Sequence, residues 1–267
     1  MQDRAKLKES NKIIIKVGTS SLTYPNGKIN FDRIERLTRV IADLQNSGKQ
    51  VVLVSSGAIA VGSGKLHREK KPRSIAEKQA LAAVGQAELV RIYQKFFGEY
   101  NQLVAQILLT RDVVTDRLKS KNARNTLNTL LKMNIIPVIN ENDTVATDEI
   151  AHLGYGDNDR LSADVACLIE GDVLIILSDI DGLFSNDPKV DASATFINKV
   201  VDITPEIEKI ADGTNGKFAK GGMATKIMAA RICAEHGVYT VIANGNDPAV
   251  INEVLQGKDI GTLFVAG

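Results

Sequence analysis

The chain has 267 residues, of which 44% are hydrophobic and 24% charged, and its formal net charge at pH 7 is +1. This composition is typical of a globular protein, and the near-zero charge gives no electrostatic reason to expect binding to nucleic acid or to a membrane surface. The longest apolar runs fall well short of the about 20 residues that span a bilayer, and the polar N-terminus has no signal-peptide pattern, so we expect a cytoplasmic protein.

Six short apolar, β-branched runs recur along the chain and predict strands. Each run is continuously hydrophobic instead of alternating, as expected for strands that are covered on both faces. They lie at residues 13–17, 51–54, 104–108, 135–139, 173–177 and 238–242.

Longer segments with helical periodicity lie between these runs, at residues 31–44, 74–97 and 223–236. The first of them is followed by Gly48, a residue that often ends helices. Its apolar stripe consists of Phe31, Ile34, Leu37, Ile41 and Leu44. Strands that alternate with helices predict a mainly parallel central sheet with helices on both faces, a three-layer α/β/α sandwich. We expect one domain, residues 1–267, with two lobes that meet near residue 171.

In such sheets, ligands bind beyond the carboxyl ends of the strands. The first predicted strand ends in Lys16, followed by Gly18 and several hydroxyl residues. A lysine in a buried strand is costly unless its ammonium group meets an anion, and Gly18 would let a phosphate approach the backbone. The segment lacks the residue order of a P-loop. The alternative is an edge-strand lysine that reaches solvent.

The second predicted strand leads into Ser56 and Gly57, small residues that open a helix. The backbone N–H groups at such a helix start can hold a carboxylate or a phosphate. A simpler interpretation is an N-cap and a turn glycine without a ligand.

Two clusters of Asn and Asp follow the fourth predicted strand. The first contains Asn140 and Asp143, and the second contains Asn158 and Asp159 at the start of a helix, with a hairpin-like segment between the clusters. Carboxylates and amides at strand ends suit an α-ammonium group, magnesium-bound waters or catalytic lysines. Asx-rich turns and an N-cap are the alternative.

The fifth predicted strand ends in Ser178 and Asp179, followed by Asp181. The Asp-x-Asp spacing alone does not predict a metal site, because no His ligand or third spaced acid accompanies it. We interpret this segment as a turn whose polar atoms contact a nucleotide.

The segment from Lys220 to Lys226 contains two glycines that lead into a helix. Lys226 lies in the first turn, where a positive charge is unfavourable against the helix dipole. A bound phosphate would explain its presence there. A solvated lysine is the alternative.

Other polar features predict no site. His67, His152 and His236 have no triad or metal-ligand spacing, and the basic run at residues 65–73 is expected to be a solvated loop. Cys167 and Cys233 have no CxxC spacing, so we expect buried thiols in a reducing compartment and neither a disulfide nor a zinc site.

Taken together, these segments resemble the amino acid kinase family, and within it the branch that phosphorylates free glutamate. The resemblance covers almost the whole chain, and the central combination of NENDTVA with GDND is the most specific part. The matching segments are IIIKVGTSSL, VVLVSSGAIAVG, KQALAAVGQ, LLTRDVV, NARNTLNTLLKMNIIPVINENDTVA, YGDNDRLSADVA, SDIDGLFSNDP, KGGMATK and GTLF.

The resemblance implies that ATP, carrying Mg²⁺, phosphorylates the γ-carboxylate of L-glutamate to γ-glutamyl phosphate, the first step of proline biosynthesis, without a metal site of the protein's own. It implies that Lys16 and Lys226 neutralise the transferring phosphoryl group while Asp159 holds both ammonium groups. Glutamate would be bound by Ser56, Gly57, Asn140, Asp143 and Asn158. ATP would be bound by Lys16, Ser178, Asp179, Lys220, Gly221, Gly222, Met223, Ala224, Thr225 and Lys226.

The resemblance also implies an amino-acid-binding lobe at residues 1–170, a nucleotide-binding lobe at residues 171–267 and a homo-oligomer that acts on small molecules, not on nucleic acid or a membrane. It suggests hand-over of the product to glutamate-5-semialdehyde dehydrogenase (γ-glutamyl phosphate reductase). Two departures are Lys220, where this branch often has Thr, and the lack of a C-terminal PUA domain after GTLFVAG.

Two alternatives remain open at this point. A related carboxylate or carbamate kinase could act on a substrate such as N-acetylglutamate, although the Asn/Asp clusters favour a substrate with a free α-ammonium group. A regulator that binds nucleotide or amino acid without catalysis is the other, and the presence of Lys16, Asp159 and Lys226 argues against it.

Overall fold

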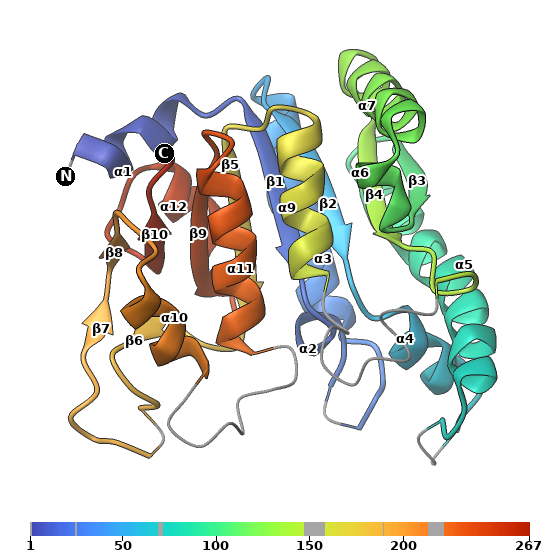
Figure 1. Cartoon of the computed structure of the whole chain (residues 1–267). Coiled ribbons are helices and arrows are strands. Elements are labelled where there is room, and N and C mark those ends of the chain that lie inside the picture. The colour runs from blue at the N-terminus through green and yellow to red at the C-terminus, as the bar shows by residue number, and fades with distance from the viewer. Residues whose placement is uncertain (1, 25, 69–71, 147–157, 189, 213–221) are drawn as a thin grey trace.

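A central eight-stranded sheet forms the middle layer of the described part of the chain (Figure 1). The computed structural model describes residues 2–24, 26–68, 72–146, 158–188, 190–212 and 222–267. In spatial order the strands are β3 Val104–Leu109, β4 Ile136–Glu141, β2 Gln50–Ser55, β1 Lys12–Val17, β5 Val173–Ser178, β9 Tyr239–Asn244, β10 Thr262–Phe264 and β8 Lys199–Val200. Neighbouring strands from β3 to β9 are parallel, whereas β10 pairs antiparallel with β9 and parallel with β8.

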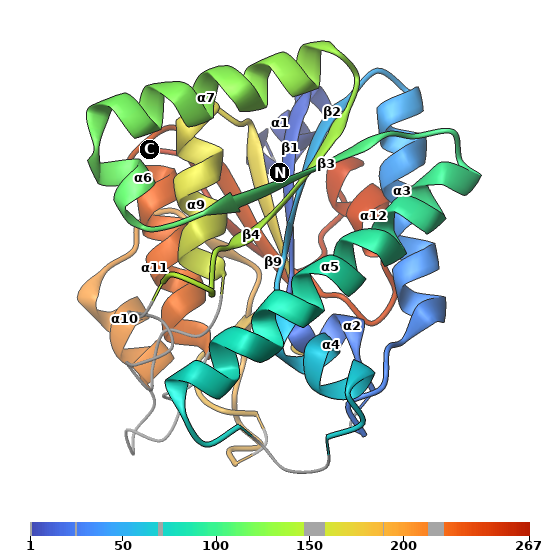
Figure 2. The ribbon, with the colours of Figure 1, turned by 90° about the vertical axis from the view of Figure 1, so that its right-hand side faces the viewer.

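Helices cover both faces of the sheet, as Figure 2 shows from its edge. On one face lie α3 Phe31–Asn46, α5 Ile75–Glu99 and α12 Val250–Leu255, and on the other lie α7 Arg117–Lys132, α9 Asp159–Leu168 and α11 Met223–Ala234. The shorter elements are α1 Gln2–Lys6, η1 Leu7–Glu9, α2 Thr19–Leu22, α4 Ala58–Lys65, α6 Asp112–Thr115, α10 Pro205–Asp212 and the hairpin of β6 Leu183–Phe184 with β7 Phe196–Ile197. The predicted α/β/α sandwich is therefore confirmed.

The predicted strands and helices agree with the observed elements to within about two residues, the usual uncertainty of element ends. Helix α3 ends before Gly48, whose φ of +90° and N–H bond to the Gln45 carbonyl (3.0 Å) complete the predicted stop. Two details of the prediction are wrong. Phe31, the first residue of α3, is 54% exposed. Most side chains of β3 are only partly buried, because β3 is an edge strand, although Leu109 is buried.

Strand β1 lies in the middle of the sheet, and its side chains alternate between the two faces. Ile13, Ile15 and Val17 pack in the core with α3 and α5, while Ile14 packs in the core with α9 and α11. Lys16 lies two residues after Ile14 on the same face of the strand, so its side chain extends toward α9 and α11. Within the described ranges, no helix is long and apolar enough to cross a membrane.

Candidate active site

The polar residues predicted from the sequence gather at the edge of the sheet where the parallel strands end. In Figure 1 this is the lower edge, where the helices α4, α9 and α11 also begin. Lys16 pairs in register with Val54 of β2 and Ile176 of β5, so the ends of these three strands are adjacent. Helix N-termini and strand carboxyl ends together favour the binding of anions.

Three charged side chains meet at the centre of this edge, and we call Lys16, Asp159 and Lys226 the charge cluster. The Nζ atom of Lys16 lies 2.7 Å from Oδ1 of Asp159, and the Nζ atom of Lys226 lies 3.2 Å from Oδ2. Asp159 is fully buried, and the two lysines are 1% and 5% exposed. Two cations thus converge on one carboxylate away from water.

Each member of the charge cluster is placed by a different element. Lys16 extends from β1 toward the helices, Asp159 is the first residue of α9, and Lys226 lies in the first turn of α11. Burial alone would raise the pKa of the Asp159 carboxyl, but the positive charges of Lys16 and Lys226 hold that pKa below its ordinary value. Asp159 therefore remains an anion at neutral pH. The alternative of a solvated lysine is wrong for both Lys16 and Lys226.

Thr225 adds a hydroxyl group to the charge cluster. Its Oγ1 lies 2.8 Å from Oδ2 of Asp159 and can donate a hydrogen bond to it. The N-cap position of α9 is held by Asn158, and the Asp159 side chain turns toward the lysines. Asp159 therefore does not act as a simple helix cap.

A polar patch from β2, β4 and the start of α9 adjoins the charge cluster. Asn158 donates from Nδ2 to Oδ1 of Asn140 (2.6 Å) and to the carbonyl of Ser55 (3.1 Å). Among the described residues, the buried atoms Nδ2 of Asn140 and Oγ of Ser56 have no hydrogen-bond partner. Buried polar atoms are rarely left unpaired, so a ligand bound here would supply the missing hydrogen-bond partners. Gly57 follows with a φ of +99°, a conformation that favours glycine.

Asp143 lies just beyond β4 and is partly buried. Burial and the neighbouring charge of Glu141 raise its pKa to about 6, although a hydrogen bond from Gln86 opposes this shift. A cationic ligand would favour the charged form of this carboxyl. Asp143 is thus suited to bind an ammonium group.

Two residues of this region were not predicted from the sequence. Gln86 of α5 is buried, contacts Asp143 and donates from Nε2 to the carbonyl of Glu141 (3.1 Å). Tyr93 of α5 is fully buried, and its hydroxyl lies 2.9 Å from Oγ of Ser55. The only sequence signal for either was the KQALAAVGQ segment, which contains Gln86.

The predicted nucleotide-contacting residues lie on the other side of β1. Ser178 ends β5 opposite Asn244 of β9, and its Oγ lies 3.3 Å from Oδ1 of Asp179. Asn244 donates from Nδ2 to Oδ1 of Asp181 (2.8 Å). Gly222 is the N-cap residue of α11, and Met223 and Ala224 are the first residues of that helix.

Some predicted features lie outside the described residues. These are Lys220, Gly221, His152 and the hairpin-like segment at residues 147–157. Both cysteines are free thiols, with Cys233 buried as expected and Cys167 only partly buried. His67 and His236 are exposed.

The described residues contain no group of three or more His, Cys, Asp or Glu side chains placed to hold a metal ion. Mg²⁺ that is bound to nucleotide phosphates usually takes only one or two protein carboxylates and keeps several waters. The Asp179 carboxylate beside Ser178 fits such a limited role.

Comparison with known proteins identifies the family and several relatives of this chain. Residues 11–244 match the model of the amino acid kinase family. The chain is 53% identical to a curated glutamate 5-kinase of Clostridium perfringens, over 98% of each chain. It is 49% identical to a glutamate 5-kinase of Enterococcus faecalis, over 99% of this chain and 98% of that one.

Solved structures share the fold at much lower identity. A UMP kinase of Bacillus anthracis superposes with a TM-score of 0.63 and 16% identity, over 96% of both chains. A UMP kinase of Ureaplasma parvum gives a TM-score of 0.65 at 16% identity, over 96% of this chain and 99% of that one. At this identity the likeness concerns the fold alone.

Proposed function

This chain belongs to the amino acid kinase family, and from that premise we propose that it transfers the γ-phosphoryl group of ATP to the γ-carboxylate of L-glutamate. The product is γ-glutamyl phosphate, and the reaction opens proline biosynthesis. The convergence of Lys16 and Lys226 on Asp159 at the carboxyl edge of the sheet is the observation that carries this proposal. The full-length similarity to two glutamate 5-kinases supports the choice of substrate.

The reaction needs no general base. The glutamate γ-carboxyl has an ordinary pKa of about 4.3, so it is already an anion at neutral pH. A carboxylate oxygen forms the new bond to the γ-phosphorus, the bond from that phosphorus to the bridging oxygen breaks, and ADP leaves with the electron pair. This agrees with the absence of a histidine from the described site.

The obstacle to the reaction is the repulsion between two anions, and the charge cluster opposes it. Phosphoryl transfer depends on positioning and on charge stabilisation more than on covalent chemistry by the protein. Lys16 and Lys226 supply two positive charges on the developing transition state, and Asp159, with the Thr225 hydroxyl, fixes the two ammonium groups in place. Mg²⁺ bound to ATP would further offset the phosphate charge, with Asp179 as the candidate protein contact.

Glutamate and ATP would approach the charge cluster from opposite sides. We assign glutamate to the part formed by residues 1–170, where Ser56, Asn140 and Asn158 surround its carboxylates and Asp143 receives its α-ammonium group. We assign ATP to residues 171–267, where Ser178, Asp179 and the start of α11 receive the nucleotide. Lys220 and Gly221 would complete the nucleotide loop.

The product is an acyl phosphate, which water hydrolyses. Hand-over to γ-glutamyl phosphate reductase (glutamate-5-semialdehyde dehydrogenase) would limit that loss, and we propose this reductase as a partner, together with self-association into a homo-oligomer. The two free thiols agree with a reducing cytoplasm.

Substrate choice tests the proposal directly. ADP release and trapping of the acyl phosphate by hydroxylamine are measured with L-glutamate, N-acetylglutamate and L-aspartate. We expect both signals with glutamate, little turnover with N-acetylglutamate, which lacks the ammonium group for Asp143, and little with aspartate, which is one methylene too short for in-line reach. Equal turnover of glutamate and N-acetylglutamate, or ADP release without a trapped product, would overturn it.

A further inference from the structure

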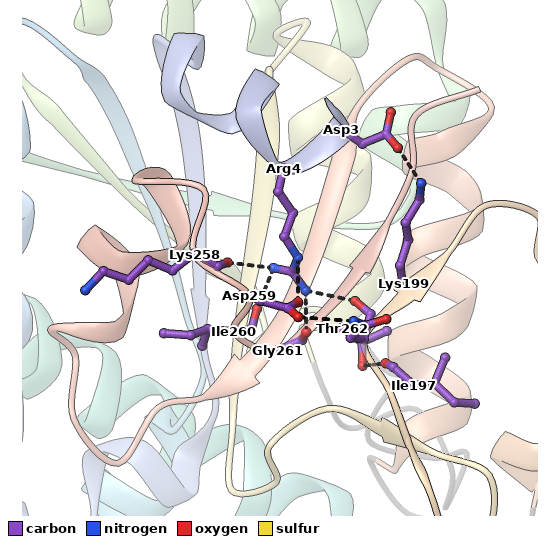
Figure 3. A network of polar contacts seen from close by, with 10 residues as sticks. Asp3, Arg4, Ile197, Lys199, Lys258, Asp259, Ile260, Gly261 and Thr262 are labelled. Carbon is purple, nitrogen blue, oxygen red and sulfur yellow. Dashed lines mark hydrogen bonds and ion pairs between the residues drawn. The ribbon is translucent and has the colours of Figure 1, made fainter. Parts of the chain in front are cut away.

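Arg4 forms a buried polar network at the edge of the sheet far from β3. Its side chain descends from α1 onto the turn before β10 (Figure 3). NH1 donates to the carbonyls of Lys258 (3.1 Å) and Ile260 (2.8 Å). NH2 donates to the carbonyls of Asn198 (2.8 Å) and Gly261 (2.7 Å). Nε pairs with Oδ1 of Asp259 at 3.0 Å.

Every N–H group of the Arg4 guanidinium therefore has an acceptor. It has five N–H groups, and the described residues provide an acceptor for each of them. Its side chain is only 9% exposed. A lysine has a single nitrogen and could not span these acceptors, so this position depends on the planar fork of arginine.

These bonds join two separate backbone segments: residues 258–261, which enter β10, and Asn198, which lies between β7 and β8. The turn is tightly placed. Gly261 has a φ of +65°, and a Cβ there would lie 2.3 Å from the carbonyl oxygen of Ile242 in β9. Arg4 thus fixes the backbone on which the next residue, Thr262, stands.

Thr262 connects this edge to the segment that follows β5. The N–H of Leu183 donates to Oγ1 of Thr262 at 2.7 Å, and the same hydroxyl donates to the carbonyl of Ile197 at 2.6 Å. A Cβ on Gly182 would lie 2.5 Å from that Oγ1, so the chain passes Thr262 closely enough to require glycine. The hairpin of β6 and β7 is thereby seated on β10.

The segment between Ser178 and Leu183 is consequently held at both ends. Ser178 is fixed by its pairing in β5, Leu183 is fixed by Thr262, and Asp181 is bonded to Asn244 between them. Asp179, which we assign to the nucleotide, lies inside this short span. The position of Asp179 therefore depends on Thr262 and, through the backbone of Gly261, on Arg4.

We propose that Arg4 is a positioning residue for nucleotide binding, acting through Thr262 on the Ser178–Leu183 segment; this rests on the assignment of ATP to that segment under the proposed function. Arg4 should not influence glutamate. The residues assigned to glutamate lie at or just beyond the ends of β2 and β4 and at the start of α9, and β1, β5 and β9 separate β2 and β4 from the Arg4 network in the sheet order.

The test compares Arg4→Lys and Thr262→Val with Asp3→Asn in the full chain. Asp3 is the matched control, because it also joins α1 to this edge, through an ion pair with Lys199, but lies outside the Arg4 network. The dissociation constant of a non-hydrolysable ATP analogue is measured by calorimetry, and KM for glutamate by ADP release. We expect Arg4→Lys and Thr262→Val each to weaken nucleotide binding about five- to tenfold while KM for glutamate stays within twofold, and Asp3→Asn to change neither.

Further variants separate positioning from general stability. The double variant should bind nucleotide no more weakly than Thr262→Val alone, because both residues act along one route. Thr262→Ser keeps the hydroxyl and should restore binding, which also tests the route if Arg4→Lys does not fold. Unchanged nucleotide affinity in Arg4→Lys and Thr262→Val, or an equal loss for nucleotide and glutamate, would overturn the proposal.

Nucleotide binding is measured without turnover, so the two proposals fail separately. If the wild-type protein binds the analogue but does not phosphorylate glutamate, the proposed function fails and the role of Arg4 is still decided by the variants. If the wild-type protein binds no adenine nucleotide, both proposals fall.

Discussion

Two regions of this molecule bury positive charge, and they do so in opposite ways. In the Arg4 network, one guanidinium meets one acceptor for each N–H group, and four of those acceptors are neutral backbone carbonyls. In the charge cluster, two ammonium groups from different elements converge on the single carboxylate of Asp159. The first arrangement uses its donors to join backbone segments, whereas the second concentrates positive charge.

The Arg4 network and the charge cluster also lie in different parts of the fold. The Arg4 network lies on the turn before β10, near the last strands of the sheet, while the charge cluster lies where β1, α9 and α11 meet at the carboxyl edge. Burial of a charge therefore does not by itself identify a catalytic residue. The partners of the charge, and the end of the sheet at which it lies, distinguish structural support from chemistry.

The largest effect is expected from the lysines of the charge cluster. Lys16→Met and Lys226→Met each remove a charge from the transferring phosphoryl group, so kcat should fall on the order of 10³-fold, a loss of about 4 kcal/mol of transition-state stabilisation. KM for glutamate should change little, and KM for ATP should rise somewhat in Lys16→Met. Lys199→Met, which loses only the partly exposed ion pair with Asp3, serves as the control. Retention of more than a tenth of wild-type kcat by either variant would reject its catalytic role.

A smaller effect is expected from the hydroxyl that supports Asp159. Thr225→Val keeps the shape of the side chain but removes the 2.8 Å bond to Oδ2. We expect kcat to fall about tenfold, the equivalent of one charge-assisted hydrogen bond, and Thr225→Ser to recover most of it. Wild-type kcat in Thr225→Val would show that this hydroxyl does not support Asp159 in catalysis.

The pH dependence should separate Asp143 from the charge cluster. Asp143 has a pKa of about 6, so it loses its charge as the pH falls through 6, and KM for glutamate should rise by up to about tenfold between pH 7 and pH 5. The pKa of Asp159 is held below its ordinary value, so kcat should stay nearly constant over that range. Steady-state profiles of wild type and Asp143→Asn check this, and the variant should show a high but pH-independent KM. A pH-dependent KM that persists in the variant would assign the titration to another group.

The smallest effect concerns stability. Because the pKa of Asp143 is raised on folding, the folded chain holds this proton more tightly than the unfolded chain, and the charged form costs stability above pH 6. Asp143→Asn should therefore raise the melting temperature by a few degrees at pH 7.5, on the order of 1 kcal/mol, and have little effect at pH 4. A lower melting temperature at pH 7.5 would show that the charge of Asp143 is stabilising.

Much of the fold and the centre of the site could be predicted because their signals are local. The apolar run of β1 and the stripe of α3 follow from side-chain periodicity, and the burial of Lys16 follows from its place inside an apolar strand. Phe31 was misplaced because periodicity gives a face of a helix but not how far the sheet extends beneath it.

The remainder depends on packing between elements distant in sequence. The hydroxyl of Thr225 reaches Asp159 only because α11 packs beside α9. Gln86 and Tyr93 contact the site only because α5 packs against the ends of β4 and β2. Arg4 had no sequence signal, because four of its partners are backbone carbonyls, at positions 194 to 257 residues further along the chain. Every residue has a backbone carbonyl, so no pattern of residue types predicts which ones Arg4 contacts.

The most direct test of the catalytic role of the charge cluster is the single-turnover rate of phosphoryl transfer in Asp159→Asn, measured at saturating ATP and glutamate. Asparagine preserves the shape of the side chain but removes the charge that holds Lys16 and Lys226. We predict that the rate constant falls on the order of 10²- to 10³-fold while the dissociation constant of glutamate stays within about threefold. A rate constant within tenfold of wild type, accompanied by a melting temperature several degrees lower, would show that Asp159 is a structural ion-pair partner and not part of the catalytic machinery.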